Sequence, residues 1–257
     1  MRLEVEVEEL GRGGDTVVLV HGLAVDGSLL RGTAAILAER GHVVLPDLRG
    51  HGRSPAAPPE ALEDYARDLV PLLEAHAPAA LVGLSFGCVV VSDLWRLLPE
   101  AVTSVVLFDP ALEIGALLAW AETESERRAI AVEEAALEPY LVSDERALLE
   151  TLARHPLSSE LEGPGLRRLA EAVLACDTET LLATLPLLRA SLPPSRPQGT
   201  TAPLTLLRAR DGILCPAAAA AAFAEREHAQ VVELPCGHQA PLTAPVLLGR
   251  AIEHALG

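Results

Sequence analysis

Residues 81–91 read LVGLSFGCVVV, an apolar run interrupted by a Gly-x-Ser-x-Gly pattern that is centred on Ser85. An apolar strand that turns at once into an apolar helix forces the residue between them into a strained backbone conformation. Gly83 and Gly87 relieve the crowding, because a Cβ at either position would clash where the strand and the helix close on each other. The stretch therefore predicts a serine on a sharp turn between a strand and a helix.

This turn would present two groups that are useful for catalysis. The hydroxyl of Ser85 is left exposed at the tip, and the amide of Phe86 lies at a helix N-terminus, where donors point outward and the helix dipole favours anions. A nucleophile would then stand beside half of an oxyanion hole. The pattern alone is also compatible with a tight packing turn of no chemical function, so the rest of the chain has to decide between the two interpretations.

Length and composition place the chain among globular proteins. Its 257 residues suit one α/β domain that carries an insertion, and 50% hydrophobic with 22% charged residues is far from the composition of disordered chains. No run of about 18 uncharged apolar residues occurs, so we expect no interaction with membranes. The first six residues alternate apolar and polar side chains and do not resemble a signal peptide, which predicts a cytoplasmic protein.

The charge and the cysteines exclude several functions. The net charge is −16, and all 20 basic residues are arginines, so binding to nucleic acid or to anionic lipid is not expected. The absence of lysine excludes Schiff-base chemistry. The four cysteines show no metal-binding spacing, and we expect reduced thiols that pack as small apolar side chains, with no metal and no cofactor. The cysteines are Cys88, Cys176, Cys215 and Cys236.

Apolar runs and helical periodicity alternate along most of the chain. Strands are predicted over residues 3–10, 16–20, 42–46, 79–84, 102–108, 203–208 and 231–234. Helices are predicted over residues 33–40, 62–75, 86–98, 216–227 and 245–256. This order is that of βαβ units, so we predict an α/β fold with a mostly parallel central sheet of about seven strands flanked by helices.

The alternation is interrupted between residues 111 and 199, where no strand pattern occurs. Helical patterns there cover residues 112–121, 125–141, 144–154, 166–176 and 179–190. We interpret the block as an all-helical cap inserted over the carboxyl edge of the sheet. The predicted domains are a core formed by residues 1–110 and 200–257 and a helical cap formed by residues 111–199.

Four polar residues follow predicted strands, namely Ser85, Asp109, Asp211 and His238. A parallel sheet brings such positions to one edge. A serine hydroxyl needs a neutral imidazole to take its proton at pH 7, and the imidazole needs a carboxylate that fixes its tautomer. Serine, aspartate and histidine occur here in the chain order expected for this kind of sheet. Either aspartate could supply the carboxylate.

Two further histidines lie in glycine-rich loops, and both are interpreted as structural. His51 belongs to the segment DLRGHGRSP over residues 47–55. We expect a turn that is held by hydrogen bonds among Asp47, Arg49 and His51. His21 directly follows a predicted strand and is likewise expected to hold its loop rather than to react.

Taken together, these motifs resemble the α/β-hydrolase fold superfamily. The matching segments are His21-Gly22, residues 47–54, residues 83–87, Asp211-Gly212 and Gly237-His238. They span nearly the whole chain in the right order, and only the cap lacks a shared signature. Within the serine-nucleophile branch, the chain is similar to enol-lactonases, esterases and cofactor-free haloperoxidase-like proteins.

The resemblance implies a role for each matching position. It implies Ser85 as nucleophile, His238 as base, Asp211 as the acid that orients the base, and the amides of Leu23 and Phe86 as the oxyanion hole. Some members of the superfamily draw the acid from the earlier strand, so Asp109 is the alternative acid. Many relatives carry a tryptophan a few residues after His-Gly, where this chain has Leu30.

We therefore predict a serine hydrolase that cleaves a carboxylic ester, lactone or thioester through an acyl-enzyme. Only 3% of the residues are aromatic, which favours a small to medium apolar substrate bound near Leu30, Trp120 and Tyr140. The same triad could instead serve a carbon–carbon hydrolase, a lyase or a perhydrolase, or the fold could be a ligand-binding module without catalysis. The expected partner is a small-molecule substrate, and the chain is expected to be a monomer or a homodimer.

Overall fold

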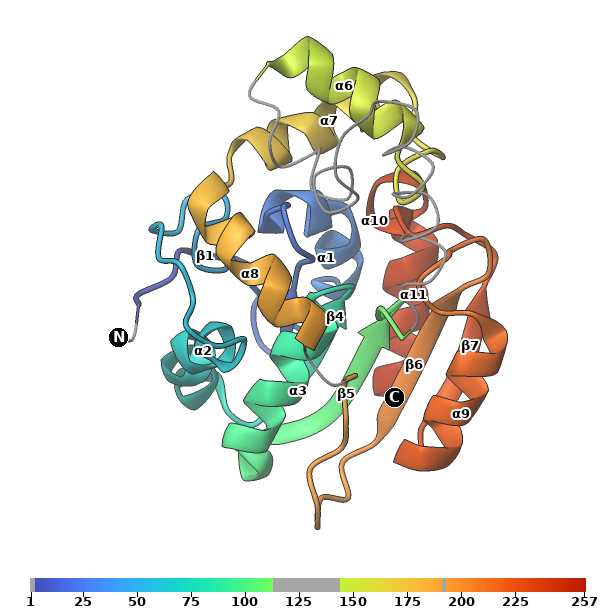
Figure 1. Ribbon diagram of the computed structural model, residues 1–257. Coiled ribbons are helices and arrows are strands. Elements are labelled where there is room, and N and C mark those ends of the chain that lie inside the picture. The colour runs from blue at the N-terminus through green and yellow to red at the C-terminus, as the bar shows by residue number, and fades with distance from the viewer. Residues whose placement is uncertain (1–2, 113–143, 191–192) are drawn as a thin grey trace.

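The computed structural model describes residues 3–112, 144–190 and 193–257, and it contains a seven-stranded sheet in the order β1-β3-β2-β4-β5-β6-β7 (Figure 1). The strands are β1 (Val7–Leu10), β2 (Thr16–Val20), β3 (His42–Pro46), β4 (Ala79–Leu84), β5 (Val102–Phe108), β6 (Leu204–Ala209) and β7 (Gln230–Leu234). All neighbouring strands are parallel except β1 and β3. The predicted α/β fold with a mostly parallel sheet is confirmed.

One strand is shorter than predicted. A strand was expected over residues 3–10, but β1 begins only at Val7, which pairs with Pro46 at the end of β3. The chain of β3 then turns away into its loop, and the Asp47 amide makes one last hydrogen bond to the Glu6 carbonyl. An edge strand can extend only as far as the partner that supplies its hydrogen bonds.

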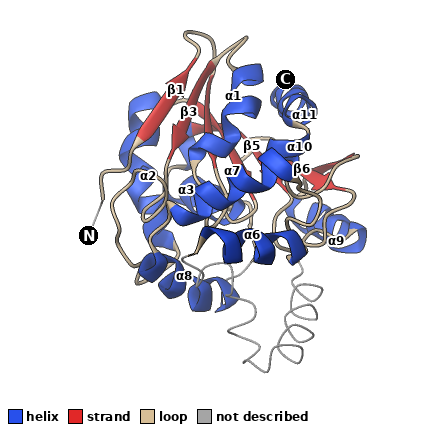
Figure 2. Ribbon diagram, turned by 90° about the horizontal axis from the view of Figure 1, so that it is seen from above, coloured by secondary structure: helices blue, strands red, loops and turns tan. Residues whose placement is uncertain are grey.

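Helices cover both faces of the sheet, as the view from above shows (Figure 2). They are η1 (Gly27–Leu30), α1 (Arg31–Leu37), α2 (Glu63–His76), α3 (Gly87–Leu97), η2 (Pro99–Ala101), α6 (Glu145–Arg154), α7 (Gly163–Leu174), α8 (Thr178–Ala190), α9 (Ala217–Glu227), α10 (Ala240–Thr243) and α11 (Pro245–Leu256). Helices α1 and α11 pack on one face of the sheet, and α2, α3 and α9 pack on the other.

The inner strands are apolar throughout because both of their faces are buried. In β2, Val18 and Val20 belong to the cluster under α2 and α3, whereas Val17 and Leu19 belong to the cluster under α1 and α11. Alternate side chains of a strand point to opposite faces, so one strand supplies both cores. The two cores hold the strand ends, and thus the loops that follow them, at one edge of the sheet.

Helices α6, α7 and α8, which we call the cap helices, confirm three of the predicted cap segments within a few residues. Helices α6 and α7 lie above the sheet in Figure 1. Their leucines form a separate small core, to which Leu29 of η1 and Leu242 of α10 contribute from below. The helices predicted over 112–121 and 125–141 lie outside the described residues apart from Leu112, so the boundaries of the cap stay a prediction.

No helix in the described parts of the chain is long and apolar enough to cross a membrane.

Candidate active site

Ser85 occupies the predicted sharp turn between β4 and α3. Its φ is 53°, a left-handed conformation that is strained for a residue with a Cβ, and its amide donates to the Phe108 carbonyl at 2.9 Å. The glycines on either side permit this turn. A Cβ at Gly83 would lie 2.4 Å from the Gly87 carbonyl oxygen, and a Cβ at Gly87 would lie 2.4 Å from the Val20 carbonyl oxygen.

Substitution of Gly87 by alanine should therefore destabilise the protein. The clashing atoms belong to the backbone of β2 and cannot rotate away, so we expect the free energy of unfolding to fall by about 2–3 kcal/mol. Gly165→Ala in α7 is the matched control, because its Cβ would make only an ordinary contact at 3.4 Å with Leu161. That variant should be as stable as the wild type or slightly more stable. Urea unfolding measures both, and a Gly87→Ala variant of wild-type stability would contradict the close approach.

Asp109 and His238 form a buried pair beside this turn. The Asp109 carboxylate, at the end of β5, is fully buried, and its Oδ2 lies 2.7 Å from Nδ1 of His238. Its Oδ1 accepts a hydrogen bond from the Ala209 amide at 3.3 Å. A carboxylate oxygen only accepts, so Nδ1 of His238 carries the proton and Nε2 presents a lone pair. The His238 side chain follows β7 and is 12% exposed.

Asp211, the aspartate that was expected to orient His238, lies elsewhere. Its side chain is 59% exposed and pairs with Arg210 at 3.2 Å. The adjacent Gly212 instead makes room for the other aspartate, because a Cβ there would lie 2.7 Å from Oδ2 of Asp109. The structure thus brings Asp109, the alternative acid, to His238. The Asp211-Gly212 turn contacts this pair through Gly212, and the Asp211 side chain points away.

The pairing of β4 with β5 places Ser85 beside Asp109 of the buried pair. Strands β4 and β5 are neighbours in which Leu84 pairs with Phe108, so Ser85 and Asp109 follow directly opposed residues. Within the described residues, the Ser85 hydroxyl makes no hydrogen bond, either to His238 or to another group. Contacts between a nucleophile and its base are often long in unliganded enzymes and shorten when substrate binds.

The amides of Leu23 and Phe86, the predicted oxyanion donors, are both available. Neither donates a hydrogen bond to any residue that the structure describes. Phe86 caps the N-terminus of α3, where the helix dipole favours negative charge. Leu23 lies in the loop after β2, whose Gly22 stands against the serine: a Cβ on this glycine would lie 3.3 Å from the Ser85 Cβ.

The loop that contains Leu23 is held by two buried histidines. His51 donates from Nδ1 to the Arg49 carbonyl at 2.7 Å and accepts at Nε2 from the Ala24 amide at 3.1 Å. His21 accepts at Nε2 from the Leu48 amide at 3.0 Å. These contacts agree with the structural interpretation of both histidines. Together the two histidines join the loop after β2 to the loop after β3. Of the predicted hydrogen bonds among Asp47, Arg49 and His51, which the structure describes in full, only that of His51 to the Arg49 carbonyl is present, because the Arg49 side chain pairs with Asp68.

Both histidines must stay neutral to accept these hydrogen bonds. Burial lowers the pKa of His51 to about 3, with a smaller contribution from His21, and burial also lowers the pKa of His21. Above pH 6.5 neither folded nor unfolded His51 binds a proton, whereas below pH 6.5 only the unfolded form does. Lowering the pH through this range therefore favours unfolding.

We expect the free energy of unfolding to fall by on the order of 2 kcal/mol between pH 6.5 and 4.5 on account of His51 alone. Urea unfolding at several pH values tests this. A His51→Gln variant should lose much of the pH dependence, even though it is less stable at pH 7. His254→Gln, which removes an exposed histidine of α11, should keep it. A His51→Gln variant with the full pH dependence of the wild type would contradict the assignment.

Two cap residues near His238 were missed by sequence reasoning. His155, at the end of α6, is buried, and its pKa is lowered to about 4 by burial, with a smaller electrostatic contribution from His238. Glu160 accepts a hydrogen bond from the Gln239 amide. No sequence pattern connects either residue to His238, since only the docking of the cap brings them together.

The predicted pocket residues are only partly placed. Leu30 is 2% exposed and packs in the core between the sheet and helices α1 and α11. Trp120 and Tyr140 lie outside the described residues. The four cysteines are free thiols, as expected. Among the described residues, no three histidine, cysteine, aspartate or glutamate side chains gather as metal ligands would.

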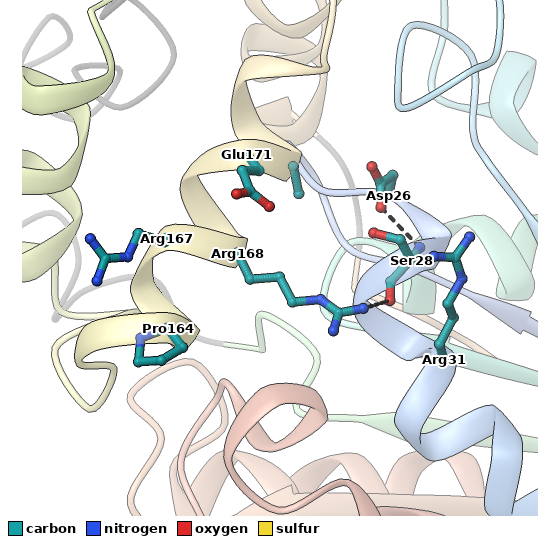
Figure 3. Close-up of a pocket in the computed structure, with 8 residues that line it drawn as sticks. Asp26, Ser28, Arg31, Pro164, Arg167, Arg168 and Glu171 are labelled. Atoms are coloured by element: carbon teal, nitrogen blue, oxygen red, sulfur yellow. Dashed lines mark hydrogen bonds between the residues drawn. The ribbon is translucent and has the colours of Figure 1, made fainter.

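A cavity of about 590 Å³ separates α7 from the loop that leads into α1 (Figure 3). Its lining consists of Asp26, Ser28, Arg31, Pro164, Arg167, Arg168, Glu171 and Ala172. Figure 3 shows the Arg168 side chain reaching across it to the Ser28 carbonyl, to which it donates at 2.7 Å. The lining contains none of the active-site candidates, so this polar cavity belongs to the contact between the cap helices and the core.

Comparison with known proteins agrees with the geometry. A family model described as "Alpha/beta hydrolase family" matches residues 17–250. The chain superimposes on the crystal structure of the enol-lactonase from Burkholderia xenovorans LB400 with a TM-score of 0.72 at 19% identity, and the superposition covers 98% of this chain and 96% of the other. That likeness concerns the fold.

Curated relatives match in part of the sequence. Lipase LipV from Mycobacterium tuberculosis is 35% identical over 117 residues, which are 44% of each chain. A pimeloyl-[acyl-carrier protein] methyl ester esterase from Methylococcus capsulatus is 39% identical over 102 residues, which are 39% of each chain. The matched region thus spans less than half of the length of each of these curated relatives.

Proposed function

Since the chain belongs to the alpha/beta hydrolase family, we propose that it is a serine hydrolase that cleaves a carboxylic ester, lactone or thioester through an acyl-enzyme. The observation that supports this most strongly is the buried hydrogen bond of 2.7 Å between Asp109 and His238, beside a serine on a strained turn. A carboxylate that accepts from Nδ1 of an imidazole fixes the tautomer that a general base needs.

In this proposal Ser85 is the nucleophile, His238 the base and Asp109 the acid, in place of Asp211. The Ala209 amide holds one oxygen of Asp109, and the other oxygen holds Nδ1 of His238. The imidazole is thereby fixed in the tautomer whose Nε2 can accept a proton. The carboxylate also stabilises the imidazolium that forms when the serine proton is transferred.

The reaction then follows from these positions. As His238 takes the proton from the Ser85 hydroxyl, the serine oxygen attacks the substrate carbonyl, whose oxygen becomes an anion. The amides of Leu23 and Phe86 are proposed to stabilise this anion. Each donor of this kind contributes about 10²–10³-fold to kcat. His238 returns the proton to the leaving alcohol, and a water molecule activated by the same base hydrolyses the acyl-enzyme.

The substrate class is proposed from two considerations. The names of the curated relatives describe a lipase and a methyl ester esterase, so carboxylic esters are the class to test first. Aliphatic residues dominate the chain, with only 3% aromatic residues, which favours a small to medium apolar acyl or alcohol group.

The test is a series of p-nitrophenyl esters of rising acyl length, assayed with the purified protein. We expect hydrolysis with an optimum at a short or medium acyl chain, and a burst of p-nitrophenol equal to the enzyme concentration if deacylation is slow. Representative lactones and thioesters extend the series. A folded protein that hydrolyses none of these compounds would contradict the proposed function.

A further inference from the structure

The segment that joins α6 to α7 lies against the loop that carries His238. The carboxylate of Glu160 accepts a hydrogen bond from the Gln239 amide, one residue after the histidine. In return, the side-chain amide of Gln239 donates to the Leu157 carbonyl at 3.0 Å. These two contacts join the cap to the active-site loop on the C-terminal side of His238.

Glu160 also covers the residue before the histidine. A Cβ built on Gly237 would lie 1.7 Å from Oε2 of Glu160 and 2.6 Å from its Oε1. The space above Gly237 is therefore filled by the carboxylate. A single side chain of the cap thus lies against both neighbours of His238, and a Cβ on Gly237 would displace its carboxylate.

The joining segment is itself fixed to the cap helices. The Ser158 hydroxyl donates to the Leu152 carbonyl of α6 at 2.7 Å, and the Leu161 amide donates to the Ser158 carbonyl at 2.9 Å. Leu161 is buried in the small core of the cap helices. Glu160 is consequently held by the cap and not by the core that carries Ser85 and Asp109.

Charged groups surround the loop on several sides. His155, at the end of α6, is a titratable neighbour, but burial lowers its pKa to about 4, with a smaller electrostatic contribution from His238, so it is neutral at pH 7. Asp109 approaches from β5, and Asp211 and Arg210 approach from the turn after β6. Because His155 is neutral, Glu160 is the charged side chain by which the described part of the cap contacts this loop.

We propose that Glu160 is a positioning residue for His238: it accepts from the Gln239 amide and lies against Gly237, and so aligns the base with Ser85. This inference rests on the proposed serine hydrolase function. Within the described residues, the Glu160 carboxylate makes no hydrogen bond to the imidazole, so it acts through the backbone that carries His238. Its loss should therefore lower kcat and leave KM nearly unchanged.

The test compares three variants in ester hydrolysis. Glu160→Ala removes the acceptor for the Gln239 amide and should lower kcat about tenfold, with KM within about twofold of the wild type. Glu160→Gln keeps a carbonyl oxygen as acceptor and should recover most of kcat. Glu162→Ala, two residues along the same segment and exposed, should match the wild type. Glu160 is exposed as well, so the alanine variant is expected to fold, which its Tm verifies.

A second comparison does not depend on Glu160→Ala alone. Gly237→Ala should lower kcat in the wild-type background, because its Cβ displaces the carboxylate. In the Glu160→Ala background the same change should have little further effect, since the three atoms nearest to that Cβ all belong to Glu160. Additive losses in the double variant would contradict the proposal.

The outcomes separate this inference from the proposed function. If the wild type hydrolyses esters and Glu160→Ala retains its kcat, or if the alanine variant raises KM while kcat is unchanged, the positioning role is wrong and the serine hydrolase stands. If the wild type hydrolyses no ester and a fluorophosphonate does not modify Ser85, the proposed function itself is wrong.

Discussion

Replacement of Ser85 by alanine is expected to lower kcat for ester hydrolysis by about 10⁵–10⁶-fold. The alanine cannot form an acyl-enzyme, and His238 then has no hydroxyl to deprotonate. The oxyanion donors and substrate binding would leave a residual rate about 10³-fold above that in water. KM should change little, because the hydroxyl contributes to the transition state more than to binding.

Ser92→Ala is the matched control for this variant. Ser92 lies in α3, seven positions along the same segment, and its hydroxyl donates to the Cys88 carbonyl at 2.9 Å. Its loss should change stability slightly and kcat by less than about twofold. A Ser85→Ala protein that keeps a tenth or more of the wild-type kcat would contradict a covalent serine mechanism.

Asp109→Asn is expected to have the second largest effect, a fall in kcat of about 10⁴-fold. The amide that replaces the carboxylate can donate to Nδ1 of His238, which would force the tautomer whose Nε2 carries the proton and cannot act as base. The side chains differ little in size, so the buried geometry should be kept. Kinetics of the purified variant, with circular dichroism to verify folding, measure this effect.

The comparison with Asp211→Asn decides between the two aspartates. The Asp211 side chain is 59% exposed and pairs with Arg210, so its replacement should change kcat by less than about threefold. A large loss in Asp211→Asn together with an active Asp109→Asn would restore Asp211 as the acid and would mean that the loop rearranges during catalysis.

The sheet could be predicted because its strands are covered on both faces. Runs such as Thr16–Val20 and Ala79–Leu84 are apolar without alternation, which is the pattern that a strand between two helix layers needs. The turn at Ser85 could be predicted because its glycines are required by contacts of 2.4 Å with the backbone. In both cases the local sequence carries the pattern, an apolar run or a pair of glycines, even where the contact that requires it is remote, as between Gly87 and Val20.

The acid of the site could not be predicted in the same way. Strands β5 and β6 are neighbours, and each is followed within two residues by an aspartate at the same edge of the sheet. Which of them faces His238 depends on the direction in which each loop leaves its strand: Asp109 has a φ of 45° and Asp211 pairs outward with Arg210. Sequence motifs identify the edge, but backbone geometry selects the carboxylate.

The cap residues that lie near His238 could not be predicted from the sequence either. His155 and Glu160 come to His238 from the segment between α6 and α7, which lies outside the helices predicted from the sequence. Their proximity results from the small core that Leu29 and Leu242 share with the cap helices. Contacts between two separately folded layers depend on how these dock, which no local signal in either layer specifies.

The most direct test of the central claim is the intact mass of the protein after treatment with a fluorophosphonate, followed by peptide mapping. We expect one adduct on Ser85 in the wild type, no adduct in Ser85→Ala, slow labelling in Asp109→Asn and wild-type labelling in Asp211→Asn. An adduct that persists in Ser85→Ala, or a folded wild type that is not labelled while it hydrolyses esters, would contradict a nucleophilic serine activated by His238 and Asp109.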